Sequence, residues 1–124
     1  MRRTKPQTVA LTLHPSSPTA AVRSVTAGAR IGGAGKLAVT FNLDADMTRI
    51  ALPKTRAPAR ADELWRHTCF EVFVALPDSE AYCELNFSPS GEWAMYGFVG
   101  YRRGMAAIEV KRPPRVAVRP TPRG

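Results

Sequence analysis

Proline and glycine interrupt this chain so often that long helices are not expected. Eleven prolines and nine glycines are spread over 124 residues. Proline breaks helices, so no stretch reaches the roughly 20 apolar residues of a membrane-spanning helix, and long soluble helices are equally disfavoured. The chain is nevertheless 44% hydrophobic, which is enough for a folded core. At this length two separate cores would each be too small, so one domain is expected. The strand patterns described below make it an all-β domain.

The net charge of +8 is typical of nucleic-acid-binding proteins, but its distribution is not. Residues 62–100 hold seven acidic residues and one basic residue, so the positive excess lies at the two ends. The predicted central strands carry Glu71 and Glu84, where a protein that follows phosphates would carry Arg or Lys. We therefore expect solvated basic ends and no nucleic-acid partner. The basic start is followed by only a short apolar run without a cleavage site, so a cytoplasmic protein with no membrane contact is expected.

The first half of the chain shows strand patterns separated by turns. Residues 7–14 alternate between polar and apolar side chains, which is typical of a strand with one buried face. Residues 22–27 and 36–43 are predicted to pair as a hairpin around the glycine-rich turn 32–35. A further short strand is expected at 49–52, followed by a proline- and arginine-bearing connection over 53–60.

Residues 69–98 give the clearest pattern, three antiparallel strands at 69–76, 82–87 and 93–98 joined by two short turns. Short turns fix the register, and cross-strand neighbours share a face of the sheet. The expected pairs are Glu71 with Asn86, Phe73 with Glu84, Glu84 with Tyr96, and Leu85 with Met95.

The alternation divides this three-stranded sheet into two unlike faces. The apolar face, which we expect to be the core, consists of Phe70, Val72, Val74, Cys83, Leu85, Phe87, Trp93 and Met95. The opposite face, called the mixed face below, consists of Cys69, Glu71, Phe73, Tyr82, Glu84, Asn86, Tyr96 and Phe98. A sugar offers a C–H face that stacks on aromatic rings and hydroxyls that bond to carboxylates and amides, so the mixed face suits a carbohydrate. The alternative interpretation is an ordinary solvated sheet face.

Enzyme and metal chemistry find little support in the residue inventory. His67 and Cys69 lie on one strand, where they rarely have the geometry to exchange a proton, and Glu71 with Glu84 would form a glycosidase pair without the loops that build a cleft. The two cysteines and two histidines lack zinc spacing, and the glycine cluster 28–37 lacks the Ser or Thr of a phosphate loop. We therefore expect no catalysis, no metal and no cofactor.

Both cysteines are expected to be reduced. Cys69 and Cys83 fall on opposite faces of neighbouring strands, several residue pairs apart, so their Cβ atoms should be too distant and misdirected for a disulfide. Haem bound non-covalently through His67 with Met95 or Met105 stays open as an alternative function.

Three strings of residues resemble those of bacterial DOMON-like domain proteins, which are related to type 9 carbohydrate-binding modules. The strings are Leu64-Trp65-Arg66-His67-Thr68-Cys69-Phe70-Glu71-Val72-Phe73, Tyr82-Cys83-Glu84-Leu85-Asn86-Phe87-Ser88-Pro89-Ser90-Gly91-Glu92-Trp93 and Tyr101-Arg102-Arg103-Gly104-Met105. This resemblance covers about a third of the chain, and it implies an antiparallel, jelly-roll-like β-sandwich whose relatives bind sugars or haem. It also implies that Trp65, Glu71 and Asn86 contact the ligand.

Combining the resemblance with the mixed face gives the full prediction. We expect a noncatalytic module in which Trp65, Arg66, Glu71, Glu84, Asn86 and Tyr96 bind a small molecule, with carbohydrate the leading class. A haem or redox module and a structural β-domain in a homo-oligomer are the alternatives.

The expected domain spans residues 1–110, and the proline- and arginine-rich residues 111–124 form a flexible tail in which only 116–118 could add an edge strand. Relatives continue for several more strands, so the chain looks C-terminally short. An incomplete sandwich would expose Phe87, Trp93 and Met95, and we therefore expect dimerisation or aggregation.

Overall fold

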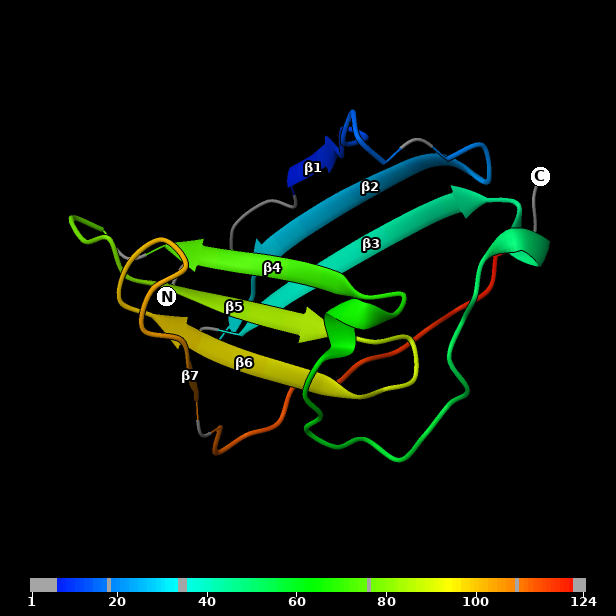
Figure 1. Cartoon of the computed structure of the whole chain (residues 1–124). Coiled ribbons are helices and arrows are strands. Elements are labelled where there is room, and N and C mark those ends of the chain that lie inside the picture. Colours follow the sequence, from blue (N-terminus) through cyan, green and yellow to red (C-terminus); the bar gives the residue numbers. More distant parts are fainter. Residues whose placement is uncertain (1–6, 18, 34–35, 76, 109, 122–124) are drawn as a thin grey trace. The chain divides into compact units, whose positions relative to one another are not determined.

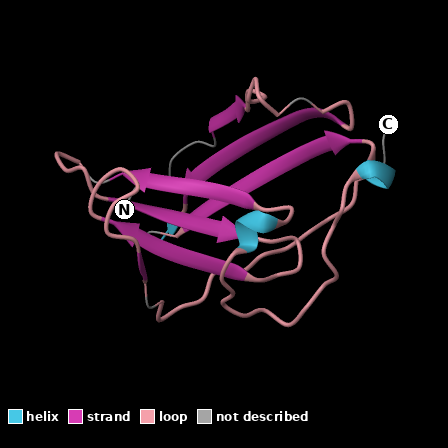
Figure 2. Ribbon diagram, viewed as in Figure 1, coloured by secondary structure: helices cyan, strands magenta, loops and turns pink. Residues whose placement is uncertain are grey.

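The computed structural model describes residues 7–17, 19–33, 36–75, 77–108 and 110–121. Seven strands form two antiparallel sheets (Figure 1). Helical structure is limited to short turns (Figure 2), and no helix in the described ranges is long and apolar enough to cross a membrane. The prediction of an all-β fold is confirmed. The chain divides into two compact units, residues 1–50 and 51–124, each of which holds one sheet.

The first unit contains a three-stranded sheet in the order β1-β2-β3. Its strands are β1 (Gln7–Ala10), β2 (Val22–Ile31) and β3 (Leu37–Ala45). The predicted hairpin is confirmed, because β2 pairs with β3 from Val22 opposite Ala45 to Ile31 opposite Leu37. Its glycine-rich turn lies partly outside the described residues.

Two expectations for this unit are wrong in detail. The strand predicted over 7–14 ends at Ala10, because the chain turns at His14, whose carbonyl accepts a 3.0 Å bond from the Ser17 amide. The strand predicted at 49–52 is absent from the structure of those residues. Arg49 instead ends the one-turn 3-10 helix η2 (Met47–Arg49), whose N-terminus is capped by the Asp46 carboxylate.

The second unit contains a four-stranded sheet in the order β4-β5-β6-β7. Its strands are β4 (Phe70–Ala75), β5 (Tyr82–Phe87), β6 (Trp93–Phe98) and the short β7 (Ala106–Ala107). All four predicted residue pairs are confirmed, including Glu71 opposite Asn86 and Glu84 opposite Tyr96. Residues 110–121 form no strand, so the edge strand considered at 116–118 is absent, and the flexibility of this tail stays a prediction.

The buried residues of the second unit are not those that the alternation alone predicts. Leu64, Ala94 and Tyr96 form its cluster of buried residues, and all three lie on the side of the sheet that carries the mixed face. On the apolar face Trp93 is buried, and Phe87 and Met95 are partly buried. The expectation that these three side chains are exposed is therefore wrong. The sandwich packing of the sheets and the single-domain organisation stay predictions.

Candidate functional site

An irregular segment, residues 56–66, crosses the sheet and covers one end of the mixed face; we call it the covering segment. It begins where the Arg56 amide donates a 2.8 Å bond to the Ser90 carbonyl. The backbone amide of Trp93 then donates to the Ala59 carbonyl at 3.1 Å, and the Trp93 carbonyl accepts from the Ala61 amide at 2.9 Å. The segment therefore pairs with β6 as a short parallel neighbour. It ends in the one-turn 3-10 helix η3 (Leu64–Arg66), which contacts β5.

Tyr96 fastens the covering segment to the sheet. Its hydroxyl donates a 2.6 Å hydrogen bond to the Asp62 carboxylate, which also accepts a 2.9 Å bond from Arg60. The Arg60 guanidinium lies 5.6 Å from the centre of the Tyr96 ring, in the geometry of a cation–π contact. Burial, followed by the bond to Asp62, raises the pKa of Tyr96 to about 12. The same bond, together with the Arg60 bond, lowers the pKa of Asp62.

Asn86 is fully buried on the mixed face, and its amide has no hydrogen-bond partner among the described residues. Its exposed fraction is 0%, and neither Oδ1 nor Nδ2 makes a hydrogen bond within the part of the chain that the structure describes. Burying an amide without a hydrogen bond costs free energy, so Asn86 is a polar group placed against its own solvation preference. The prediction that the mixed face points entirely outward is therefore wrong for Asn86 and Tyr96, which are both buried. The sequence did not reveal this burial, because the covering segment has no periodic pattern that marks it as packed.

Glu71 and Glu84 remain accessible on the same face. Glu71 is exposed and stands opposite Asn86, while Glu84 is partly exposed and stands opposite Phe73. Neither carboxylate makes an ion pair or a hydrogen bond within the described ranges. Partial burial, and then the negative charge of Glu84, raises the pKa of Glu71. The two carboxylates thus repel each other without a counterion.

The two remaining predicted contacts lie on η3. Trp65 is 46% exposed, and its ring meets Tyr96 edge-on with centroids 6.2 Å apart. The structure thus brings Trp65 to the mixed face. Arg66 is exposed and forms a 3.7 Å ion pair with Glu63, so its charge is already engaged next to η3.

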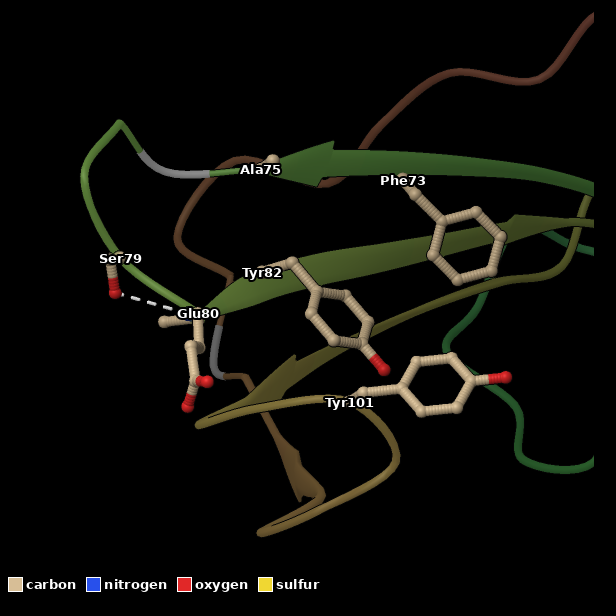
Figure 3. Close-up of a pocket in the computed structure, with 7 residues that line it drawn as sticks. Phe73, Ala75, Ser79, Glu80, Tyr82 and Tyr101 are labelled. Atoms are coloured by element: carbon tan, nitrogen blue, oxygen red, sulfur yellow. Dashed lines mark hydrogen bonds between the residues drawn. The ribbon is translucent and has the colours of Figure 1, made fainter.

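A shallow hollow of about 300 Å³ lies at the uncovered end of the mixed face (Figure 3). It is lined by Phe73, Ala75, Ser79, Glu80, Ala81, Tyr82 and Tyr101. Figure 3 shows the rings of Phe73, Tyr82 and Tyr101 on the same side of the strands. Phe73 is 57% exposed and Tyr101 74% exposed, so two of the three rings present large apolar surfaces to solvent.

Tyr82 is the fixed ring of this hollow. It stacks on Phe98 with centroids 4.7 Å apart and an interplanar angle of 8°. Its hydroxyl accepts a 3.1 Å bond from the Arg102 amide, which ties the Tyr101 loop to β5. Phe73 lies 6.1 Å from Tyr82, centre to centre.

Phe73 and Tyr82 belong to the mixed face by their alternation, but neither is among the contacts predicted from the sequence. The same alternation that selected Glu84 was sufficient to find them. Tyr101 had no such signal, because it lies in a turn after β6 rather than on a strand.

The other candidate chemistries gain nothing from the geometry. Cys69 and Cys83 are free thiols, as predicted, and burial followed by the Glu71 charge raises the pKa of Cys69 to about 11. No group of three His, Cys, Asp or Glu side chains that could hold a metal ion occurs within the residues that the structure places. His67 lines a second hollow with Arg66 and Thr68, whereas Met95 belongs to the apolar face.

Comparison with known proteins found no family model, no curated protein and no solved structure that matches this chain. The candidate site is therefore defined by its own chemistry. It joins an open aromatic hollow to the carboxylates of Glu71 and Glu84, with a buried amide beside them.

Proposed function

We propose that this chain is a noncatalytic binding module of the DOMON-like, type 9 carbohydrate-binding kind, and that it binds a carbohydrate on the mixed face. The observation that carries the proposal is the aromatic hollow next to the Glu71 and Glu84 pair. Glu84 stands opposite Phe73 and two residues from Tyr82 on the same strand face, so hollow and carboxylates are contiguous.

This arrangement supplies both parts of sugar recognition. Exposed rings can stack on the C–H face of a pyranose, and carboxylates can accept hydrogen bonds from its hydroxyls. Tyr82 is held by Phe98 and the Arg102 amide, so at least one ring is ordered before a ligand arrives. Preorganised groups lose little conformational entropy on binding, which favours affinity.

The experiment is a glycan screen followed by titration of each binder against matched variants. Tyr101→Ala and Phe73→Ala should each weaken binding by about tenfold, because each removes one stacking surface. Val118→Ala is the control, since Val118 is an exposed apolar side chain that does not line the hollow. The proposal is wrong if no glycan binds, or if the hollow variants bind as well as the Val118 control.

One observation favours a second function, a structural β-domain in a homo-oligomer. β4 is an edge strand of its sheet, and it carries Phe73 and Val74, which are 57% and 40% exposed. Edge strands with exposed apolar side chains readily pair with other chains. Sedimentation would distinguish the two functions, because an oligomer that dissociates in Val74→Lys but retains sugar binding would separate assembly from ligand recognition.

The haem alternative rests on residue types alone, with His67 and either Met95 or Met105 as the ligands of the iron. An absorption spectrum of the purified protein tests it directly. A Soret band would favour haem over the carbohydrate proposal.

A further inference from the structure

The two carboxylates of the candidate site have no counterion among the described residues, although the chain is strongly basic. The sequence contains 18 Lys and Arg against 10 Asp and Glu. Other acidic residues do form ion pairs with arginines, namely Asp44, Asp62, Glu63 and Glu80. Glu71 and Glu84 have no such partner within the described part of the chain. A positive group brought to this position would be the first charge to compensate them.

The surroundings of the two carboxylates also favour a cation. Phe73, opposite Glu84, is 57% exposed, and Tyr82 lies two residues away on the same strand face. The negative faces of aromatic rings attract ammonium groups. The raised pKa of Glu71, caused by burial and then by the Glu84 charge, agrees with an uncompensated negative site. Carboxylates and rings thus attract the same sign of charge.

The buried amide of Asn86 is the second, independent observation. Asn86 is the direct cross-strand partner of Glu71, so its side chain projects from the sheet on the same face and beside that carboxylate. It is fully buried, and neither its oxygen nor its nitrogen has a hydrogen-bond partner in the described ranges. A bare metal ion would bond only the oxygen. A ligand with an ammonium group and a neighbouring hydroxyl would satisfy both atoms, with N–H donating to Oδ1 and the hydroxyl oxygen accepting from Nδ2.

We propose that the site is selective for a cationic sugar, an amino sugar whose ammonium group lies between Glu71 and Glu84 and whose adjacent hydroxyl bonds to the Asn86 amide. The inference rests on the proposed carbohydrate function and specifies its ligand class. Because Asn86 is fully buried and η3 contacts its strand β5, the bond to the amide forms as the side chains above it move aside. The carboxylates need no such movement.

Three β-linked oligosaccharides of equal length provide the test, built from glucose, from glucosamine and from N-acetylglucosamine. They differ only at one ring position, which carries a hydroxyl, an ammonium or a neutral amide. Calorimetry at low salt, at a mildly acidic pH that keeps the amine charged, should show the glucosamine chain binding about tenfold more tightly than either neutral chain. The overall positive charge of the protein repels this ligand, so tighter binding requires a local negative site.

Variants locate the effect. Glu71→Gln with Glu84→Gln should remove the preference for the glucosamine chain, and Asn86→Leu should weaken its binding. Asp44→Asn with Glu63→Gln is the matched control, because it removes the same number of charges from exposed carboxylates that are already paired with Arg23 and Arg66. In the unaltered protein, NMR titration with the glucosamine chain should shift the signals of Glu71 and Glu84, which tests the site without any variant.

The outcomes separate the two proposals. Equal binding of charged and neutral chains overturns the inference and leaves the carbohydrate function standing. A preference for the glucosamine chain that survives the double substitution, or that does not perturb Glu71 and Glu84, also overturns it. Failure of all three chains to bind overturns the inference, whereas the carbohydrate function is then decided by the wider glycan screen.

Discussion

Tyr96 donates its phenolic hydrogen to the Asp62 carboxylate across 2.6 Å, and this bond joins the centre of the sheet to the covering segment. Tyr96 is 4% exposed, whereas the Asp62 side chain is 63% exposed. The bond therefore reaches from the edge of the buried cluster to the surface. Arg60 completes the arrangement by bonding Asp62 and lying over the Tyr96 ring. We expect this cluster to hold the covering segment on the sheet.

Removing the Tyr96 hydroxyl should therefore loosen the covering segment without emptying the core. Tyr96→Phe keeps the buried ring and removes one hydrogen bond, so we expect a loss of about 1 kcal/mol in the free energy of unfolding. Chemical denaturation measures this change. Tyr101→Phe is the control, since Tyr101 is 74% exposed and should tolerate the same substitution. Equal stability of the two variants would show that the Asp62 bond contributes nothing.

The thiol of Cys69 should be unreactive at neutral pH. Burial, and then the Glu71 charge, raises its pKa from 9.0 to about 11, so the reactive thiolate is depleted about a hundredfold relative to an unperturbed thiol. In a Cys83→Ser variant, alkylation by iodoacetamide should be correspondingly slower than that of free cysteine. Because the folded state holds the proton more tightly, the stability from this group is intact below pH 9 and is lost as the pH rises through 11. Alkylation at the rate of free cysteine would contradict the expected burial.

Gly91 should not tolerate a side chain. Its φ of +101° is a conformation that other residues rarely adopt, and a Cβ atom there would lie 3.3 Å from the Arg56 carbonyl oxygen. Gly91→Ala should lower the free energy of unfolding by about 1–3 kcal/mol and detach the start of the covering segment from the Ser88–Gly91 turn. Gly32→Ala is the control, because its Cβ would meet the Lys36 carbonyl at an ordinary 3.8 Å. Thermal unfolding of both variants tests the difference.

The register of the second sheet was predictable from the sequence, whereas the position of the covering segment over that sheet was not. Short turns such as Pro77–Glu80 leave few ways to pair two alternating strands, so Glu71 opposite Asn86 followed directly. The covering segment has no period, and its position depends on single contacts such as the Arg56 amide to the Ser90 carbonyl. Local pattern carries no information on such long-range bonds. The polar residues of the mixed face were therefore found correctly, whereas the burial of Asn86 was not.

Asn86 offers the sharpest test of this burial. Its amide is desolvated without a hydrogen bond among the placed residues, so an apolar side chain of similar size should suit the position better. Asn86→Leu should raise the free energy of unfolding by about 1 kcal/mol. Ser90→Ala should have the opposite sign, because Ser90 is also buried but its hydroxyl donates to Glu92 at 2.9 Å and accepts from the Glu92 amide at 3.2 Å. Urea denaturation of both variants gives the comparison.

A carboxylate at position 86 should make the stability of the fold depend on pH. Asn86→Asp would bury a carboxylate next to Glu71 and near Glu84, so it should destabilise the fold at neutral pH and recover stability in acid, where the new group is protonated. If Asn86→Leu is less stable than the natural protein at every pH, the amide has partners in solution and the site is already satisfied. If Asn86→Leu stabilises the fold and abolishes binding of the glucosamine chain, the protein keeps an unfavourable amide because that amide binds the ligand.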